Sequence, residues 1–252
     1  MEKDTKNLNQ SIIKAFTVLD AFTDEKKEWG VRELASKTGY NKSTTYRLLS
    51  TLVSLHIVHQ NENEKYSLGS KLFELGNRVS LYESLTTISN HPIKNIALDI
   101  EETVLLGVLK EGQVLYINKA DSLNGLKIST SIGSYQPAHA TATGKLLMAF
   151  SSSEKQNNYL RNNTFDALTD NTITSTPALK KEFSTIKKQG YALDLEELEL
   201  GLICIAIPVF NKKGEAIAGV SASGPSSRFK MENVEKYISM LQKGVSVIEK
   251  SL

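Results

Sequence analysis

The segment His139–Lys145, HATATGK, combines small residues with a glycine-lysine pair, as phosphate-binding loops do. Such a loop requires Gly-x-x-x-x-Gly-Lys followed by Ser or Thr. Here His139 takes the first glycine's position and Leu146 takes the last position, so we exclude nucleotide hydrolysis. A helix that starts here would still offer free backbone N–H groups to an anion, near Ala142, Thr143 and Gly144. The alternative is an ordinary helix start that is capped by water.

Cys204 is the single cysteine of the chain, which excludes an intramolecular disulfide and a cysteine-rich zinc site. A catalytic thiol needs a nearby base or a positive local field. Cys204 instead lies inside the apolar run Leu202–Ile207, where a small core residue is the usual interpretation. An enzyme that uses a pocket around Cys204 is therefore only the alternative function, and its mark would be a paired acid and base near the thiol. We expect no catalytic residue, cofactor or metal site.

Ser221 and Ser223 lie at positions i and i+2, on one face of a predicted strand that is otherwise apolar. Hydroxyl groups in a buried strand must be paired or face a wet cavity, so the two serines point to a ligand site. Asp194 belongs to the acidic segment Gly190–Glu197, whose simplest interpretation is a solvated loop.

The segment Asn41–Leu52 carries a different kind of site. One face of the predicted helix is apolar, with Thr45, Leu48, Leu49 and Leu52 at helical spacing. The other face has cations and hydroxyls without a carboxylate: Lys42, Ser43, Tyr46 and Arg47, with Thr44 at its edge. Such a face indicates contact with DNA, and the alternative is an ordinary solvated surface.

The flanking segments favour the DNA-binding interpretation. Val31–Thr38 is a short amphipathic helix, Gly39 can end it, and Asn41 is suited to cap the next helix, which together make a helix-turn-helix. The β-prone runs Ile57–Gln60 and Lys65–Leu68 then predict a hairpin, the wing of a winged helix.

Each side chain of this motif has an expected contact with double-stranded operator DNA. We expect Arg47 and Lys42 to contact phosphates or guanine edges, Ser43 and Thr44 phosphates, and Tyr46 a phosphate or a thymine methyl group. Lys65 in the wing could touch the DNA backbone. One short helix reads few base pairs, so we expect a homodimer, or a tetramer, on a pseudo-palindromic operator.

These motifs, in this order and spacing, resemble the IclR family of bacterial transcriptional regulators over nearly the whole chain. The matching segments are Arg32–Ala35, Lys42–Leu49, Tyr66–Gly69, His139–Lys145, Gly201–Ala206 and Ser221–Pro225. The resemblance implies a ligand-responsive DNA-binding regulator, with a repressor as the expected type. It also implies a GAF-like effector-binding domain, with Asp194 at a pocket position and Cys204 lining the pocket. The family usually has Arg where Ile203 stands, so we expect more apolar surroundings here.

The polar groups of this expected pocket indicate the chemical class of its effector. The N–H groups of residues 142–144 and the serine hydroxyls can donate hydrogen bonds to a carboxylate, whereas an ionised Asp194 can only accept them. A molecule with a carboxylate at one end and a hydroxyl or an amine at the other satisfies both requirements. We therefore expect a small hydroxylated or keto acid with its donor end on Asp194.

The fold class that these elements predict is α+β. A winged helix-turn-helix domain (residues 1–68) is joined by a linker helix (69–84) to an α/β sensor domain with an antiparallel sheet (85–252). The first helix, Asn9–Phe22, should turn Ile12, Ile13, Phe16, Leu19 and Ala21 or Phe22 toward the core. The linker helix should run over Leu72–Tyr82. In the sensor domain we expect helices at 84–101, 141–150, 177–189 and 231–252, and strands at 103–109, 114–118, 126–131, 202–210 and 216–223.

Composition and charge are those of an ordinary globular protein. Hydrophobic residues make up 40% of the chain, charged residues 23%, and the net charge is +2. The charge alone therefore does not announce a nucleic-acid partner, which must be argued from where the cations lie. No apolar run approaches the roughly 20 residues of a membrane span, so we expect a cytoplasmic protein without a membrane partner.

Overall fold

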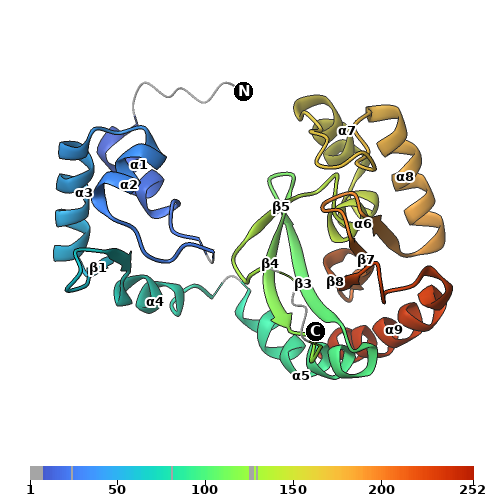
Figure 1. Ribbon diagram of the computed structural model, residues 1–252. Coiled ribbons are helices and arrows are strands. Elements are labelled where there is room, and N and C mark those ends of the chain that lie inside the picture. The colour runs from blue at the N-terminus through green and yellow to red at the C-terminus, as the bar shows by residue number, and fades with distance from the viewer. Residues whose placement is uncertain (1–7, 24, 81, 125–127, 129) are drawn as a thin grey trace. The chain divides into compact units, whose positions relative to one another are not determined.

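The computed structural model describes residues 8–23, 25–80, 82–124, 128 and 130–252. The chain divides into two compact units, Met1–Leu81 and Tyr82–Leu252, shown in Figure 1. Among the described residues, none of the helices combines the length and the apolar character that crossing a membrane requires.

The first unit is a winged helix-turn-helix. Its elements are α1 (Gln10–Leu19), α2 (Val31–Thr38), α3 (Lys42–Ser54), β1 (Val58–Gln60), β2 (Tyr66–Leu68) and α4 (Ser70–Gly76). The β1–β2 pair is antiparallel, and a bridge from Trp29 to Tyr66 extends the wing. Trp29 is therefore a packing residue, in a core that it shares with Leu34, Leu49 and Val58.

The predicted turn between α2 and α3 is confirmed in detail. Gly39 ends α2 with φ of 73°, a left-handed conformation that glycine adopts without steric cost. The side chain of Asn41 then accepts a hydrogen bond from the N–H of Thr44 at 2.8 Å and caps α3. Thr45, Leu49 and Leu52 are buried, so α3 presents its opposite face to solvent.

The burial predicted for α1 is only partly confirmed: Leu19 and the following Ala21 and Phe22 pack in the core as predicted, whereas the first half of the stripe does not. Ala15, Val18 and Leu19 form its inward stripe, whereas Ile12, Ile13 and Phe16 are 57%, 40% and 60% exposed. The helix has two apolar stripes, and only one of them can pack on the three-helix core. The other stripe is left without a partner inside the described part of its own unit.

The predicted linker helix is too long. Helix α4 ends at Gly76, Asn77 follows as its C-cap, and no residue of α4 is buried. Glycine costs about 1 kcal/mol relative to alanine in a helix, and here no packing offsets that cost. Leu81, which the prediction included, lies outside the described residues, and the next helix begins at Glu83.

The second unit is built on an antiparallel sheet of strand order β5-β4-β3-β8-β7-β6. The strands are β3 (Thr103–Lys110), β4 (Gln113–Ala120), β5 (Tyr135–Pro137), β6 (Ala192–Leu195), β7 (Leu202–Phe210) and β8 (Ala216–Pro225). The helices are α5 (Glu83–Ile100), α6 (Ala142–Phe150), α7 (Ser153–Asn162), α8 (Thr176–Gln189) and α9 (Val234–Lys250). This arrangement confirms the α+β class.

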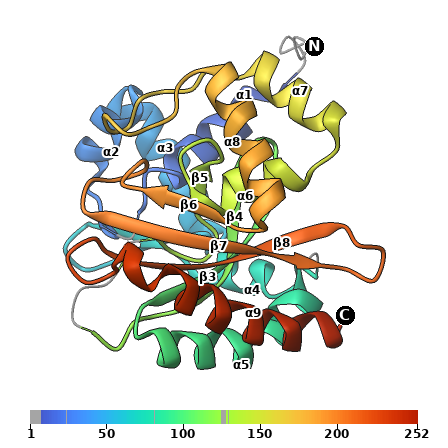
Figure 2. The same ribbon diagram turned by 90° about the vertical axis from the view of Figure 1, so that its right-hand side faces the viewer.

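Helices cover both faces of the sheet. Figure 2 shows α5 and α9 on one face and α6 with α8 on the other. Alternation along β7 divides its side chains between the two layers: Ile203, Ile205 and Ile207 join the core under α5 and α9, whereas Cys204 and Ala206 face α6 and α8.

Several details of this unit differ from the prediction. Strand β5 and helix α7 were not predicted, and Ala192–Leu195, expected as a loop, is strand β6. Of the predicted strand at 126–131, residues 126, 127 and 129 lie outside the described residues. The last helix begins with a 3₁₀ turn, Met231–Asn233.

Candidate functional site

The register of the sheet builds the candidate site. Asp194 on β6 lies opposite Cys204 on β7, which lies opposite Ser223 on β8. Ser221 lies two residues before Ser223, on the same face and opposite Leu105 of β3. The start of α6 covers this row of side chains.

A small cavity opens between this row and α6. Its volume is about 10 Å³ for the centre of a water molecule, room for roughly one water. Six of the seven predicted effector residues line it: Ala142, Thr143, Asp194, Cys204, Ser221 and Ser223. The other lining residues, which the sequence reasoning missed, are Leu105, Tyr116, Ile128, Thr130, Thr141, Leu198 and Leu202.

The missed lining residues have a weak signal in the sequence. Leu105 and Tyr116 occupy positions on the α6 side of their strands, and Tyr116 carries a polar phenol into a buried position. Such a phenol between the apolar residues Leu115 and Ile117 resembles the serine pair, and period-2 alternation could have placed it on that face.

Asp194 is fully buried, so the alternative interpretation of a solvated acidic loop does not hold for this residue. Its Oδ1 accepts hydrogen bonds from the N–H groups of Glu197 at 2.8 Å and Leu198 at 3.3 Å. Its Oδ2 has no hydrogen-bond partner among the described residues. Burial raises the pKa of Asp194 from its usual 3.8 to about 7, although the Glu197 N–H opposes this shift. The site therefore holds a carboxyl group that ionises near neutral pH, and one of its two oxygens accepts no hydrogen bond from the described residues.

The environment of Cys204 is unsuited to a nucleophile. Burial raises the pKa of its thiol well above the usual range, and the Asp194 carboxylate raises it further. A reactive thiolate requires a positive field, and the charge facing this thiol is negative. Among the described residues, no group of three or more potential ligands is placed to hold a metal ion.

The start of α6 only partly fits the anion-site prediction. The Thr141 hydroxyl caps the helix by accepting the N–H of Gly144 at 3.1 Å, so that N–H is not free. Gly144 does not line the cavity, and a Cβ there would lie 2.3 Å from the Cα of Ala138. In this structure Gly144 therefore serves the close packing of α6, and its N–H serves the helix cap. Thr143 does line the cavity, and its buried Oγ1 has no hydrogen-bond partner among the described residues.

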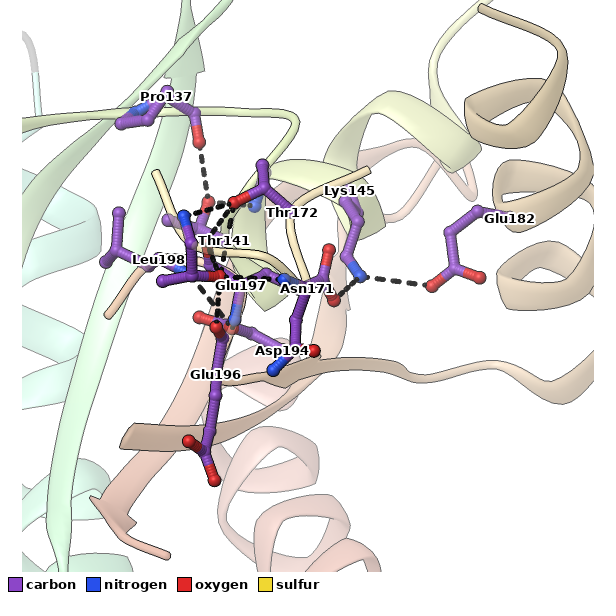
Figure 3. Close-up of polar contacts among 12 residues, drawn as sticks. Pro137, Thr141, Lys145, Asn171, Thr172, Glu182, Asp194, Glu196, Glu197 and Leu198 are labelled. Carbon is purple, nitrogen blue, oxygen red and sulfur yellow. Dashed lines mark hydrogen bonds and ion pairs between the residues drawn. The ribbon is translucent and has the colours of Figure 1, made fainter. Parts of the chain in front are cut away.

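A buried ion network lies behind the cavity, and the sequence reasoning missed it. Lys145 is 1% exposed, and its Nζ donates to the carboxylates of Glu197 and Glu182, as Figure 3 shows. The signal in the sequence is a lysine inside the apolar helix that continues as Leu146–Phe150.

The expectation that Ile203 makes the pocket more apolar is wrong. Ile203 packs in the core under α5 and α9, on the opposite face of the sheet from Cys204. Any side chain at that position leaves the strand on the face opposite the cavity.

The second candidate site is the outer face of α3 in the other unit. Lys42, Ser43, Tyr46 and Arg47 are exposed, and Tyr46 is 56% exposed although it is a large aromatic residue. Thr44 is half-buried at the edge of this face. The Ser43 hydroxyl donates to the Asn41 side chain at 2.9 Å, which supports the cap.

Lys65 is paired within its own unit. Its Nζ lies 2.8 Å from Oε2 of Glu33, and Lys26 binds Oε1 of the same carboxylate at 2.9 Å. The hydrogen bond from Lys65, followed by that from Lys26, lowers the pKa of Glu33 to about 2. Lys65 therefore joins the wing to α2, and a contact with DNA would have to share or break that pair.

Comparison with known proteins agrees on one family. A model described as "IclR helix-turn-helix domain" matches residues 11–62, and one described as "Bacterial transcriptional regulator IclR C-terminal" matches residues 55–250. The HTH-type transcriptional regulator KdgR of Escherichia coli is 39% identical over 92% of this chain and 88% of its own length. The transcriptional repressor IclR of Escherichia coli is 29% identical over 95% of this chain and 88% of its own length.

Solved structures give the same result. The IclR structure from Thermotoga maritima is 30% identical, covers 96% of this chain and 98% of its own, and superposes with a TM-score of 0.77. An IclR homologue from Microbacterium hydrocarbonoxydans, solved with 4-hydroxybenzoate, superposes with a TM-score of 0.84. It is 21% identical and covers 96% of this chain and 99% of its own, so it supports the fold.

The burial of Asp194 predicts a pH-dependent stability. Because its pKa is raised to about 7, the native protein keeps a proton that the unfolded chain has lost, and stability falls as pH rises from about 4 to 7. Asp194→Asn stays neutral and keeps an acceptor oxygen. We expect the free energy of unfolding of the variant, relative to wild type, to rise by about 2.5 kcal/mol between pH 5 and pH 8.

Urea denaturation at a series of pH values measures this difference. Asp170→Asn, at an exposed position, is the matched control and should show a flat difference. A flat difference for Asp194→Asn as well would contradict the assignment of a buried, proton-holding carboxyl group.

Proposed function

The chain belongs to the IclR family of bacterial transcriptional regulators, and we propose that it is a repressor controlled by a small hydroxy or keto acid. Its relatives are DNA-binding regulators and not enzymes, so the alternative of a processing enzyme around Cys204 has no support. The proposal places the effector in the cavity at Asp194 and the operator on α3. A regulator of transcription acts where the chromosome is, so the cytoplasm is the proposed compartment.

The observation that carries the proposed effector class is a pair of poorly satisfied polar atoms. Oδ2 of Asp194 and Oγ1 of Thr143 are buried without a well-formed hydrogen bond among the described residues, and both side chains line the same cavity. Their polar neighbours are the Cys204 thiol and the Tyr116 phenol, and a thiol is a weak donor. Leaving such groups unpaired costs about 1–3 kcal/mol each. A ligand with a hydroxyl group on Asp194 and a carboxylate on the hydroxyls of Ser221, Ser223 and Thr143 would satisfy both.

The size of the cavity adds a condition. Since it holds roughly one water, an acid of three or more carbons has to move the lining side chains apart when it binds. The 4-hydroxybenzoate bound by the Microbacterium homologue also carries a hydroxyl and a carboxylate at opposite ends, so it belongs in the panel of test ligands.

The proposed assembly is a homodimer. Its support is the apolar surface of the first unit: Ile12, Ile13 and Phe16 on α1, with Phe73 and Val79 in and after α4, which are 77% and 63% exposed. A two-fold dimer carries two copies of α3, which matches a pseudo-palindromic operator with half-sites about one helical turn or a multiple apart.

Arg47 provides the test of the DNA-binding face. Arg47→Ala should weaken operator binding by about 1–3 kcal/mol if the guanidinium reads a base, and by less, uniformly over sequences, if it touches phosphate. Arg47→Lys should restore only the phosphate contribution, because an ammonium lacks the planar fork that fits guanine. Fluorescence anisotropy on a selected genomic fragment measures both.

Arg161→Ala is the control for net charge, since Arg161 is exposed on α7 in the other unit. Unchanged operator affinity of Arg47→Ala, with an unchanged circular dichroism spectrum, would exclude Arg47 from the interface.

The dimer is tested by light scattering at micromolar concentration. We expect at least a dimer, and Phe16→Glu should shift the mass toward the monomer because a buried unpaired charge is costly. Val247→Glu, at another exposed apolar position, should leave the mass unchanged. A wild-type monomer, with and without DNA, is incompatible with the proposed assembly.

The effector class is tested with matched pairs of acids. We expect glycerate to bind at least about tenfold more tightly than lactate, and hydroxypyruvate more tightly than pyruvate, because the extra hydroxyl reaches Asp194. Asp194→Asn should shrink both differences. Isothermal titration calorimetry measures them. If purely apolar aromatics bind best and the small acids do not bind at all, this effector class is refuted.

A further inference from the structure

Lys145 is a buried cation in the effector domain, and its side chain does not line the cavity. It is among the largest fully buried side chains, and its Nζ contacts the carboxylates of Glu197 and Glu182, the latter at 3.2 Å. It does not line the cavity, whereas Ala142 and Thr143 on the same helix do. A buried ammonium is costly unless it is paired, so the position of Glu197 is tied to that of α6.

Glu197 belongs to the turn that fixes Asp194. Its N–H donates to Oδ1 of Asp194 at 2.8 Å, while its side chain is held by Lys145 (Figure 3). The Thr172 hydroxyl donates to the carbonyl of Glu197 at 2.6 Å, and the Thr169 hydroxyl donates to that of Glu196 at 2.6 Å. The turn is thus fastened at its backbone by threonines and at its side chain by Lys145.

The network also sets the charge around Asp194. One ammonium faces two carboxylates, Glu182 on α8 and Glu197, and Oε2 of Glu197 is buried without a partner among the described residues. Burial raises the pKa of Glu197, and Lys145 opposes that rise. Glu197 raises and Lys145 lowers the pKa of Asp194, whose other titratable neighbours are Cys204 on β7 and Tyr116 on β4.

We propose that Lys145 is a positioning residue of the effector pocket. Through Glu197 it connects the pocket wall at the start of α6 to the turn that holds Asp194. A charge outside the cavity therefore fixes the position of the Asp194 carboxyl group toward a ligand. This inference rests on the proposed function only in naming the cavity as the effector site.

The first test follows Asp194 itself, in the full-length protein and without a ligand. Aspartate labelled with ¹³C at the side-chain carboxyl is titrated by NMR, and Asp194→Asn assigns the signal. Glu197→Gln removes an anion and keeps the ammonium, so the titration midpoint of Asp194 should fall by about one unit. Lys145→Met with Glu197→Gln removes both charges and should return the midpoint toward wild type.

Glu182→Gln is the matched control, because it removes the other carboxylate partner of the Lys145 ammonium, on the side away from Asp194 (Figure 3). It should leave the titration midpoint of Asp194 in place. A midpoint that is unchanged in Glu197→Gln, or that moves equally in Glu182→Gln, overturns the proposal. A merely structural role of the network would not predict the return of the midpoint in the double variant.

The second test uses Cys204, the single cysteine of the chain, as a reporter of pocket opening. The rate of its modification by methyl methanethiosulfonate should rise at least about tenfold in Lys145→Met. Without the ion pair, the start of α6 and the turn at Asp194 can move apart and expose the thiol. Loss of the ammonium also disfavours the thiolate, which would slow the reaction, so a rise in rate reports opening.

Leu241→Ala, on the opposite face of the sheet, is the control for stability. If it raises the rate as much as Lys145→Met at equal free energy of unfolding, Lys145 acts on stability alone and the proposal fails. If Lys145→Met does not fold, the neutral double variant takes its place in the same comparison. Neither test needs an effector, so a failed panel of acids would refute the proposed effector class and leave this inference standing.

Discussion

Asp194 is buried where strand β6, the start of α6 and the turn after β6 meet, and a carboxyl group in such a place must find hydrogen-bond donors or give up its charge. Two N–H groups satisfy one oxygen, and the other faces the cavity without a partner. The rest of the effector domain can be understood from this requirement. The sheet register sets Cys204 and Ser223 beside the carboxyl group, and the Lys145 network holds the turn that supplies its donors.

In both units, the spacing of apolar residues decides which side chains face the core and which face a binding site. In the first, a single apolar stripe on α3 fixes the helix against its core, so the opposite face is free to meet DNA. In the second, alternation on β7 and β8 separates the residues of the hydrophobic layer under α5 and α9 from those that line the Asp194 cavity. The departure at Ile203 illustrates the rule, since a side chain one residue from Cys204 belongs to the other face.

Much of this could be predicted from local patterns. The helix-turn-helix follows from helical spacing, a glycine and a cap, and the serine pair follows from a period of two. What depends on contacts between distant segments could not be predicted. Ile12 and Phe16 look like core residues until the packing of α1 is known, and the length of α4 depends on packing that Gly76 does not receive. Lys145 looked like part of a failed phosphate loop, because its partners lie 37 and 52 residues further along the chain.

In the proposed regulator, occupancy of the Asp194 cavity changes the affinity of α3 for a two-fold-symmetric operator. Selection of genomic fragments by the purified protein, with and without a pool of small hydroxy and keto acids, measures this coupling. We expect the selected fragments to share a pseudo-palindromic sequence and the acids to change their enrichment. The variant Ser221→Ala/Ser223→Ala should select the same fragments with little response to the acids. Equal enrichment by the wild type with and without every acid, or an equal response in the variant, would exclude the coupling.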